Sequence, residues 1–212
     1  FYVLGPLISR FGKVNVSLPG GCAWGPRPVD YHLKGLEQLG AKLNLESGNI
    51  LAEAEELVGT DIYFEFPSVG ATGNLVKAAV KARGTTKLYN CAKEPEIDDL
   101  ISFLKKLGCK IKRIGKRSIN VLGVKELKST VHKVIFDRIE AGTYIIAAAL
   151  TNGRMKITNI NPKIMSTEIS LLNKMNVKII KKKHYITVTC PKKIKSVNIT
   201  TKPYPGFPTD LQ

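Results

Sequence analysis

The chain of 212 residues repeats one pattern three times, with a period of about 68 residues. In each copy an amphipathic helical pattern ends in a short turn, and a segment of alternating apolar residues follows it. The turns read LGAK, LGCK and MNVK and begin at residues 39, 107 and 175. Gly40 and Gly108 suit the left-handed conformation that ends many helices, and Asn176 is the next best residue there. The period and the turn chemistry therefore indicate three related helix–strand repeats.

A second pattern recurs between these turns. An Ala-rich helical segment runs into a Gly-containing turn and a strand at residues 78–88 and again at 147–157, and residues 4–16 resemble the end of the same pattern. Pro28, Pro95 and Pro162 are expected to open the helices that lead to the three turns. We predict an α/β (α+β) chain of β-α-β-α-β-β repeats at about 1–66, 67–135 and 136–212. One such repeat buries its apolar faces poorly alone, so several are expected to pack around a shared core.

The composition favours a cytoplasmic protein that does not span a membrane. Hydrophobic residues make up 43% of the chain, but no segment approaches the roughly 20 apolar residues of a membrane span. The four cysteines, at positions 22, 91, 109 and 190, have no CxxC spacing. Neither a disulfide framework nor a metal knuckle is therefore expected. Neither end has the character of a natural terminus, so both are interpreted as cuts through a longer protein.

The formal net charge of +16 leaves two interpretations open. Basic runs at residues 105–117, 181–183 and 192–195 are compatible with a nucleic-acid-binding repeat protein. The other interpretation is a set of solvated Lys faces with a field that attracts small anions. Aromatic residues are few and are not interleaved with the basic runs, so the sequence predicts no stacking platform and no nucleic-acid partner.

Residues 19–30, PGGCAWGPRPVD, form a loop that the other two repeats lack. The loop places Cys22 among glycines and puts Arg27 five residues later. A thiol has an ordinary pKa of about 8.5, which a nearby cation lowers, and a guanidinium binds phosphate well. Cys22 is therefore a candidate acid or nucleophile acting on an anionic substrate. A small buried thiol and a surface arginine beside a helix start are the alternatives.

Two further segments contain candidate site residues. Ser68 precedes an Ala-rich helix, and it either caps this helix or helps its first N–H groups to bind a phosphate. Asp210 follows a proline-rich loop and is either a helix cap or a base. The three histidines, at positions 32, 132 and 184, share no neighbourhood in the sequence and are interpreted as surface or internally satisfied residues.

The loop resembles the signature of the UDP-N-acetylglucosamine enolpyruvyl transferases, with PGGC, four residues and then RPVD. A sister family, the enolpyruvylshikimate-phosphate synthases, shares the fold but not the Cys loop. Further matching segments follow in family order along the chain: GLEQLGA at 35–41, SVGAT at 68–72, EPEI at 94–97, DRIEAGT at 137–143 and FPTD at 207–210.

The resemblance implies an inside-out α/β barrel of the enolpyruvyl transferase type, in which each of two domains has three repeats. Residues 1–135 would be two repeats of the first domain, including the Cys loop at 19–30. Residues 136–212 would be the first repeat of the second domain. No cofactor and no metal are implied.

The resemblance also implies a reaction. Phosphoenolpyruvate would pass its enolpyruvyl group to the 3-hydroxyl of UDP-N-acetylglucosamine, releasing phosphate, as the first committed step of peptidoglycan synthesis. Cys22 would protonate phosphoenolpyruvate, form a covalent adduct and be the target of fosfomycin, and Asp210 would be the base. The implied substrate-binding residues are Arg27, Pro28, Val29, Asp30, Tyr31, Ser68, Val69, Gly70 and Asp210.

Several features depart from the family pattern. Trp24 and Pro26 replace smaller loop residues, and Phe66 stands where some members have a lysine. Other family residues that bind substrate fall outside these 212 positions. We therefore expect this chain alone to bind substrate weakly and to turn over little.

Overall fold

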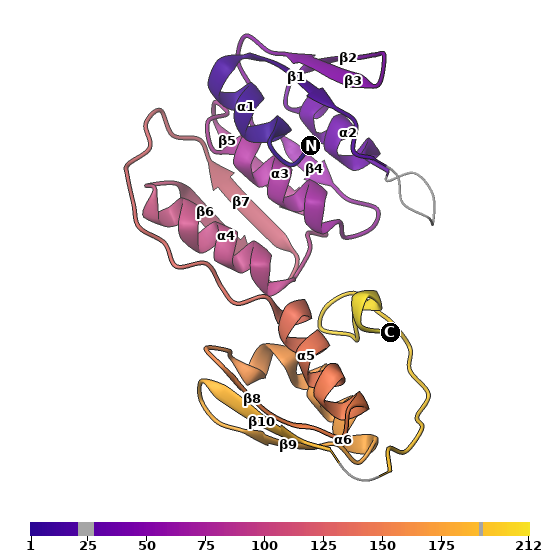
Figure 1. The fold of residues 1–212 in the computed structure, drawn as a ribbon. Helices are drawn as coiled ribbons and strands as arrows, with labels where there is room; N and C mark the ends of the chain where they lie inside the picture. The colour runs from indigo at the N-terminus through magenta and orange to yellow at the C-terminus, as the bar shows by residue number, and fades with distance from the viewer. Residues whose placement is uncertain (21–27, 191–192) are drawn as a thin grey trace. The chain divides into compact units, whose positions relative to one another are not determined.

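The computed structural model describes residues 1–20, 28–190 and 193–212. The chain divides into two compact units, Phe1–Lys133 and Val134–Gln212. The first compact unit contains two repeats and the second contains one (Figure 1).

The repeats follow one another in element order along the chain. The first repeat consists of α1 (Leu4–Phe11), β1 (Lys13–Ser17), α2 (Asp30–Gln38), β2 (Lys42–Glu46) and β3 (Asn49–Glu53). The middle repeat consists of β4 (Asp61–Tyr63), α3 (Val69–Ala79), β5 (Thr85–Tyr89), α4 (Pro95–Lys106), β6 (Lys110–Ile114) and β7 (Ser118–Leu122). The third repeat consists of α5 (Arg138–Leu150), β8 (Arg154–Thr158), the 3-10 helix η1 (Pro162–Met165), α6 (Ser166–Lys174), β9 (Lys178–Lys181) and β10 (Tyr185–Thr189), and a short 3-10 helix η2 (Thr209–Leu211) follows it.

The middle repeat has the expected order β-α-β-α-β-β, and the other two show the same order from their first helix onward. Their sheets share one topology: the strand orders are β1-β3-β2, β5-β7-β6 and β8-β10-β9, all antiparallel. In the middle repeat β4 adds a fourth strand, parallel to β5. All three sheets are open, and within the described residues no sheet closes into a barrel.

The predicted helix ends are confirmed. Gly40, Gly108 and Asn176 have φ angles of 99°, 97° and 69°, in the left-handed region. The proline prediction holds fully only for Pro95, the first residue of α4. Pro162 opens the 3-10 turn η1, from which α6 continues, and α2 begins two residues after Pro28. Proline fixes one φ angle, but it does not decide whether the next turn is α-helical.

Helices form the inside of the first compact unit. α3 packs against α1, α2 and α4 (Figure 1). Its residues are buried around almost the whole circumference of the helix. Its Leu75 and Val76 have no exposed surface. A helix that is apolar on all sides is stable only at the centre of a core. The Ala-rich sequence therefore makes α3 the central element and leaves the sheets outside it.

Close contact between α2 and α3 depends on Gly35. A methyl group added at this residue would overlap the side chain of Leu75. Alanine is the better helix former by about 1 kcal/mol, but overpacking a core costs typically about 1–3 kcal/mol.

We therefore expect Gly35→Ala to destabilise the protein by roughly 1–2 kcal/mol in urea unfolding. Combining it with Leu75→Ala should cost less than the sum of the two single changes, because the two sites are in contact. Lys34→Ala, an exposed change in the same helix, is the control and should be nearly neutral. Additivity of Gly35→Ala and Leu75→Ala would contradict the proposed overlap.

The second compact unit has a core of its own. α5 and α6 pack on the sheet β8-β10-β9 around Ile145, Met165, Ile169, Ile186 and Val188. Asp137 caps α5, where its Oδ1 accepts hydrogen bonds from the N–H groups of residues 139 and 140 at 2.7 and 3.1 Å.

Candidate functional site

The structure describes eight of the ten residues that the sequence predicts for the site. Cys22 and Arg27 lie outside the described residues. The eight others are Pro28, Val29, Asp30 and Tyr31 before and in α2, Ser68, Val69 and Gly70 at the start of α3, and Asp210 in η2. The first two groups belong to the first compact unit, and Asp210 belongs to the second.

The start of α2 presents polar and aromatic groups side by side. Asp30 is the first residue of the helix and is exposed, and Pro28 is exposed as well. The ring of Tyr31 meets the ring of Phe64 edge-on, with centroids 6.1 Å apart. Because Phe64 follows β4, this contact joins the start of α2 to the segment that leads into α3.

Ser68 is the N-cap of α3, one of the two alternatives that the sequence leaves open for it. Its Oγ accepts a hydrogen bond from the N–H of Ala71 at 3.2 Å. A cap of this kind typically stabilises a helix by about 1 kcal/mol. The observed cap does not exclude a second function, because the N–H groups of Val69 and Gly70 also belong to the first turn.

The starts of α2 and α3 lie next to each other (Figure 1). A methyl group added at Gly70 would lie 3.1 Å from Nε2 of His32 and 3.2 Å from its Cε1. The structure therefore brings together two of the segments that the sequence predicted separately, residues 28–31 and 68–70. Two helix starts that face the same region can offer several N–H donors to one anionic ligand.

A buried polar chain supports this junction. Asn74, fully buried in α3, accepts a hydrogen bond from the N–H of Gly5 in α1 through its Oδ1 at 2.7 Å. Its Nδ2 lies 3.0 Å from Nδ1 of His32 in α2. Because the backbone N–H of Gly5 can only donate, the amide orientation of Asn74 is fixed and its Nδ2 is the donor to His32.

His32 must then be neutral, with its proton on Nε2 and its Nδ1 accepting. Burial, helped by the positive charge of Lys77 and opposed by Asp30, lowers the pKa of His32 from 6.5 to about 4. The residue as a whole is only 8% exposed. His32 therefore presents an N–H donor toward Gly70 throughout the neutral pH range.

This shift predicts how stability depends on pH. Below pH 6.5 the unfolded state takes up a proton at His32 and the folded state does not, so stability falls as the pH drops from 6.5 toward 4. Between pH 7 and pH 5 we expect a loss of about 2 kcal/mol from this group.

Urea unfolding at both pH values measures the loss, and His32→Gln should reduce it, since glutamine does not titrate. His184→Gln changes an exposed histidine and is the matched control. An unchanged pH dependence in His32→Gln would contradict the assignment.

Asp210 lies in η2 and is exposed. It is the second residue of that turn, whereas Pro208 occupies the cap position, so the interpretation of Asp210 as a helix N-cap is wrong. The neighbouring Phe207 and Leu211 are buried, and a methyl group at Gly142 in α5 would overlap Leu211. These contacts hold η2 against the start of α5 and leave the carboxylate of Asp210 free to reach solvent.

The polar chain is not evident from the sequence alone. The sequence is compatible with His32 as a surface or internally satisfied residue and identifies no partner for Asn74. One signal is present: Asn74 is a polar residue in a helical segment composed mostly of Gly, Ala, Val and Leu, and a buried polar residue needs a partner. The identity of that partner depends on how α1, α2 and α3 pack, which the sequence does not state.

Two other types of site can be considered for the described part of the chain. It contains no cluster of three or more His, Cys, Asp or Glu residues that could hold a metal ion. Burial raises the pKa of the Cys91 thiol to about 12, so this thiol is not a nucleophile at neutral pH.

None of the helices in the described ranges has the length and apolar character to cross a membrane.

Comparison with known sequences identifies relatives along the whole chain. The chain is 56% identical over 211 residues to the UDP-N-acetylglucosamine 1-carboxyvinyltransferase of Pelagibacter ubique (strain HTCC1062), covering 99% of this chain and 51% of that protein. It is 50% identical over 212 residues to UDP-N-acetylglucosamine 1-carboxyvinyltransferase 2 of Clostridium tetani (strain Massachusetts / E88), covering 100% of this chain and 51% of that protein. The chain thus spans about half the length of the curated relatives it matches.

Solved structures support the same grouping at the level of the fold. The enolpyruvyl transferase NikO from Streptomyces tendae superimposes with a TM-score of 0.85 at 23% identity, over 99% of this chain and 51% of that one. An EPSP synthase from Acinetobacter baumannii gives a TM-score of 0.65 at 19% identity, over 89% of this chain and 45% of that one. The chain has the enolpyruvyl transferase fold. The sequence model of one family, described as EPSP synthase (3-phosphoshikimate 1-carboxyvinyltransferase), matches residues 1–212, and the chain therefore belongs to that family.

Proposed function

We propose that this chain is part of a UDP-N-acetylglucosamine 1-carboxyvinyltransferase that acts in the cytoplasm in peptidoglycan synthesis. The observation that carries the proposal is the identity of 56% with the Pelagibacter ubique enzyme of that name over 99% of the chain. The PGGC–RPVD loop at residues 19–30 supports the same activity within the wider family. The substrates would be phosphoenolpyruvate and UDP-N-acetylglucosamine, with no cofactor.

The nucleotide sugar would bind where α2 and α3 begin. Residues 28–31 and 68–70 lie next to each other there, and the Nε2–H of His32 faces Gly70. Backbone N–H groups of two helix starts suit the carbonyl oxygens of a uracil or the oxygens of a diphosphate. Arg27 would add a guanidinium that binds phosphate from the loop.

The chemistry would need one acid and one base. Cys22 would donate its proton to the methylene carbon of phosphoenolpyruvate while the sugar 3-hydroxyl adds to C2, and Asp210 would accept the proton of that hydroxyl. Loss of a proton from the new methyl group and departure of phosphate would then give the enol ether. The Cys22 thiolate could also add to C2 and form the covalent adduct. A lid formed by residues 19–30 would exclude water during these steps.

We also propose that the repeats belong to two domains of the inside-out barrel type. Residues 1–135 would supply two repeats of the first domain and residues 136–212 the first repeat of the second. The shared strand order of the three sheets and the central position of α3 support this arrangement. The barrel would be completed by parts of a longer protein. The 212-residue chain alone would then release little phosphate, and robust phosphate release by it would contradict this part of the proposal.

Mass spectrometry of the longer protein tests the chemistry. After incubation with phosphoenolpyruvate or fosfomycin, a single adduct is expected on Cys22 and none on Cys91 or Cys109, which are buried. An adduct on another residue, or no adduct under conditions of full turnover, would overturn the assignment of Cys22.

The alternative of a basic nucleic-acid-binding protein rests on the net charge alone. Thermal unfolding separates the two functions. UDP-N-acetylglucosamine is expected to raise the melting temperature of the longer protein, because a ligand that binds only the folded state stabilises it. Tight, strongly salt-dependent binding of single or double strands without any effect of the nucleotide sugar would favour the alternative instead.

A further inference from the structure

Each repeat contains the same corner. There the end of the strand that follows the first helix (β1, β5 or β8) meets the tip of the hairpin formed by the last two strands (β2–β3, β6–β7 or β9–β10). One backbone hydrogen bond joins the two in every copy: Leu18 N–H to the Gly48 carbonyl at 2.9 Å, Cys91 N–H to Arg117 at 2.7 Å, and Ile160 N–H to His184 at 3.2 Å. In the first repeat the sequence inserts residues 19–30, the loop of the proposed active site, immediately after this corner. The equivalent corners of the other two repeats occupy the same place in the fold without this insertion.

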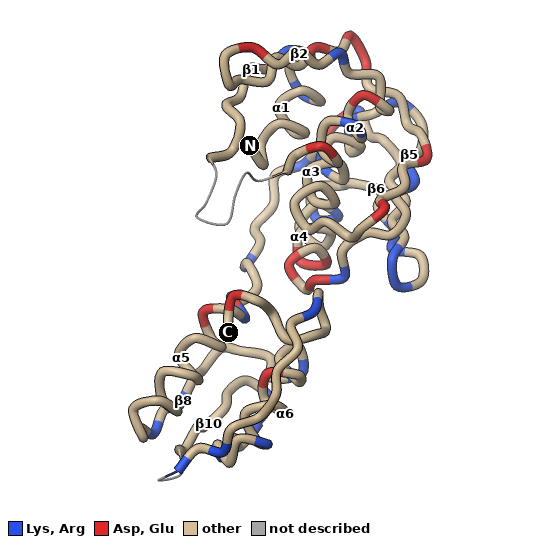
Figure 2. The backbone as a smooth tube through the Cα atoms, turned by 90° about the vertical axis from the view of Figure 1, so that its right-hand side faces the viewer, with Lys and Arg blue, Asp and Glu red and all other residues tan. Residues whose placement is uncertain are grey.

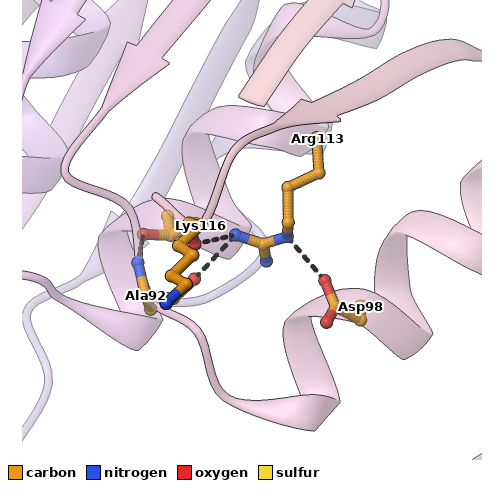
Figure 3. A network of polar contacts seen from close by, with 5 residues as sticks. Ala92, Asp98, Arg113 and Lys116 are labelled. Carbon is orange, nitrogen blue, oxygen red and sulfur yellow. Dashed lines mark hydrogen bonds and ion pairs between the residues drawn. The ribbon is translucent and has the colours of Figure 1, made fainter. Parts of the chain in front are cut away.

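In the middle repeat an arginine closes the corner. The guanidinium of Arg113 donates to Oδ1 of Asp98 at 2.7 Å and to the carbonyls of Ala92 and Lys116 at 3.2 and 3.5 Å (Figure 3). The Arg113 side chain is only 19% exposed. These bonds tie the start of α4, the end of the strand and the hairpin tip together.

The third repeat has a basic residue at the position of Arg113 but no acidic residue at the position of Asp98. The period of 68 residues aligns the buried Ile101 and Ile111 of the middle repeat with the buried Ile169 and Ile179 of the third. The same alignment places Lys181 at the position of Arg113 and Ser166 at the position of Asp98. The ion pair that fills the corner in the middle repeat therefore has no counterpart in the third.

A cavity of about 780 Å³ opens at this corner of the third repeat. It is lined by Asn161, Pro162, Lys163, Ser166, Lys181, Lys182, Lys183 and His184. Both members of the aligned pair, Lys181 and Ser166, are in this lining. Its volume lies in the range of about 300–1,000 Å³ that is usual for small-molecule sites.

The charge of the cavity is strongly one-sided. Four of the described lining residues are lysines and none is an Asp or Glu. Residues 134–212 as a whole hold 13 Lys and Arg against four Asp and Glu, and Figure 2 shows the basic positions along this part of the chain. A concave surface lined by charges of one sign concentrates the field and attracts counter-ions. The lysine stems and Pro162 supply apolar walls beneath the ammonium groups.

We propose that this cavity is a second anion site, which binds an oligophosphate. Several ammonium groups around one concavity match a ligand with several adjacent negative charges, and Ser166 and Asn161 add neutral hydrogen-bonding groups. The site lies wholly within the second compact unit and does not depend on the proposed transferase activity. Its ligand is either a bare oligophosphate or one attached to a nucleoside.

Calorimetry with the whole chain tests the site, with inorganic tripolyphosphate and ATP as separate probes at fixed ionic strength. The double variant Lys181→Ala with Lys183→Ala is expected to raise the Kd by roughly tenfold, since each lost contact weakens binding severalfold. The matched control is Lys174→Ala with Lys178→Ala, which removes two exposed charges from α6 and β9 outside the cavity. This control is expected to change the Kd less than about twofold, from the altered net charge alone. Tighter binding of ATP than of tripolyphosphate would assign the nucleoside form.

Ser166→Asp gives a second, independent variant. It restores the acid that the middle repeat has at this position, and the exposed site tolerates the change. The new carboxylate should pair with Lys181 and abolish binding of both probes, although it lowers the net positive charge of the chain by only one. Equal loss in the cavity and control double variants, or no loss in either, would overturn the proposal, as would full binding by Ser166→Asp.

Discussion

Replacing Cys22 with serine is expected to lower the kcat of the longer protein by about a thousandfold or more. General acid catalysis contributes typically 10²- to 10⁴-fold, and a serine hydroxyl is a far weaker acid than a thiol with a pKa near 8.5. The covalent adduct with phosphoenolpyruvate should disappear as well, since serine without an adjacent base is a poor nucleophile. Phosphate release measures the first effect and mass spectrometry the second.

Cys109→Ala provides the control for this change. Cys109 is a buried core residue, and its substitution should leave kcat within about twofold of the original, because the cavity it creates lies in the core. Binding of UDP-N-acetylglucosamine should persist in Cys22→Ser, which would show that the site is intact. A Cys22→Ser protein with unchanged kcat would remove the central residue of the proposed mechanism.

Asn74→Ala is expected to destabilise the protein by about 3 kcal/mol. The change leaves the N–H of Gly5 and the Nδ1 of His32 buried without their partner, and each unsatisfied group costs about 1–3 kcal/mol. Urea unfolding of the chain measures the loss. Asn44→Ala, at an exposed position in β2, is the control and should stay within about 0.5 kcal/mol.

A second readout distinguishes the polar chain from simple loss of packing. Without the Nδ2 donor of Asn74, protonation of His32 no longer breaks a hydrogen bond, so the pKa of His32 should rise. Burial should still hold it below its ordinary value. The stability lost between pH 7 and pH 5 should therefore be smaller in Asn74→Ala than in the original chain. A steeper pH dependence in the variant would contradict the donor role of Asn74.

The local features of the fold could be predicted from the sequence because each one is encoded by adjacent residues. The left-handed conformations at Gly40, Gly108 and Asn176 follow from residue type at the end of an amphipathic pattern. The Ser68 cap is local in the same sense, since donor and acceptor are three residues apart. Because the three repeats share one period, the order β-α-β-α-β-β predicted for the middle repeat also applies to the other two from their first helix onward.

The site could be predicted only in pieces. Residues 28–31 and 68–70 were predicted separately, but their meeting through His32 and Gly70 depends on helix packing across some forty residues of sequence. The polar chain from Gly5 to His32 was missed for the same reason. The sequence leaves two interpretations of the lysines at 181–183 open, a nucleic-acid-binding run and a solvated face. Comparison with the Arg113–Asp98 pair of the middle repeat is needed to see that the aligned position opposite Lys181 holds no acid.

The central position of α3 reverses the usual distribution of protection against hydrogen exchange. In a protein with a buried sheet, the strand amides exchange last, through global unfolding. Here the sheets of the first compact unit lie at the periphery, while α3 is enclosed by α1, α2 and α4. The amides of Leu75 and Val76 should therefore be the last to take up deuterium, after those of every surrounding strand.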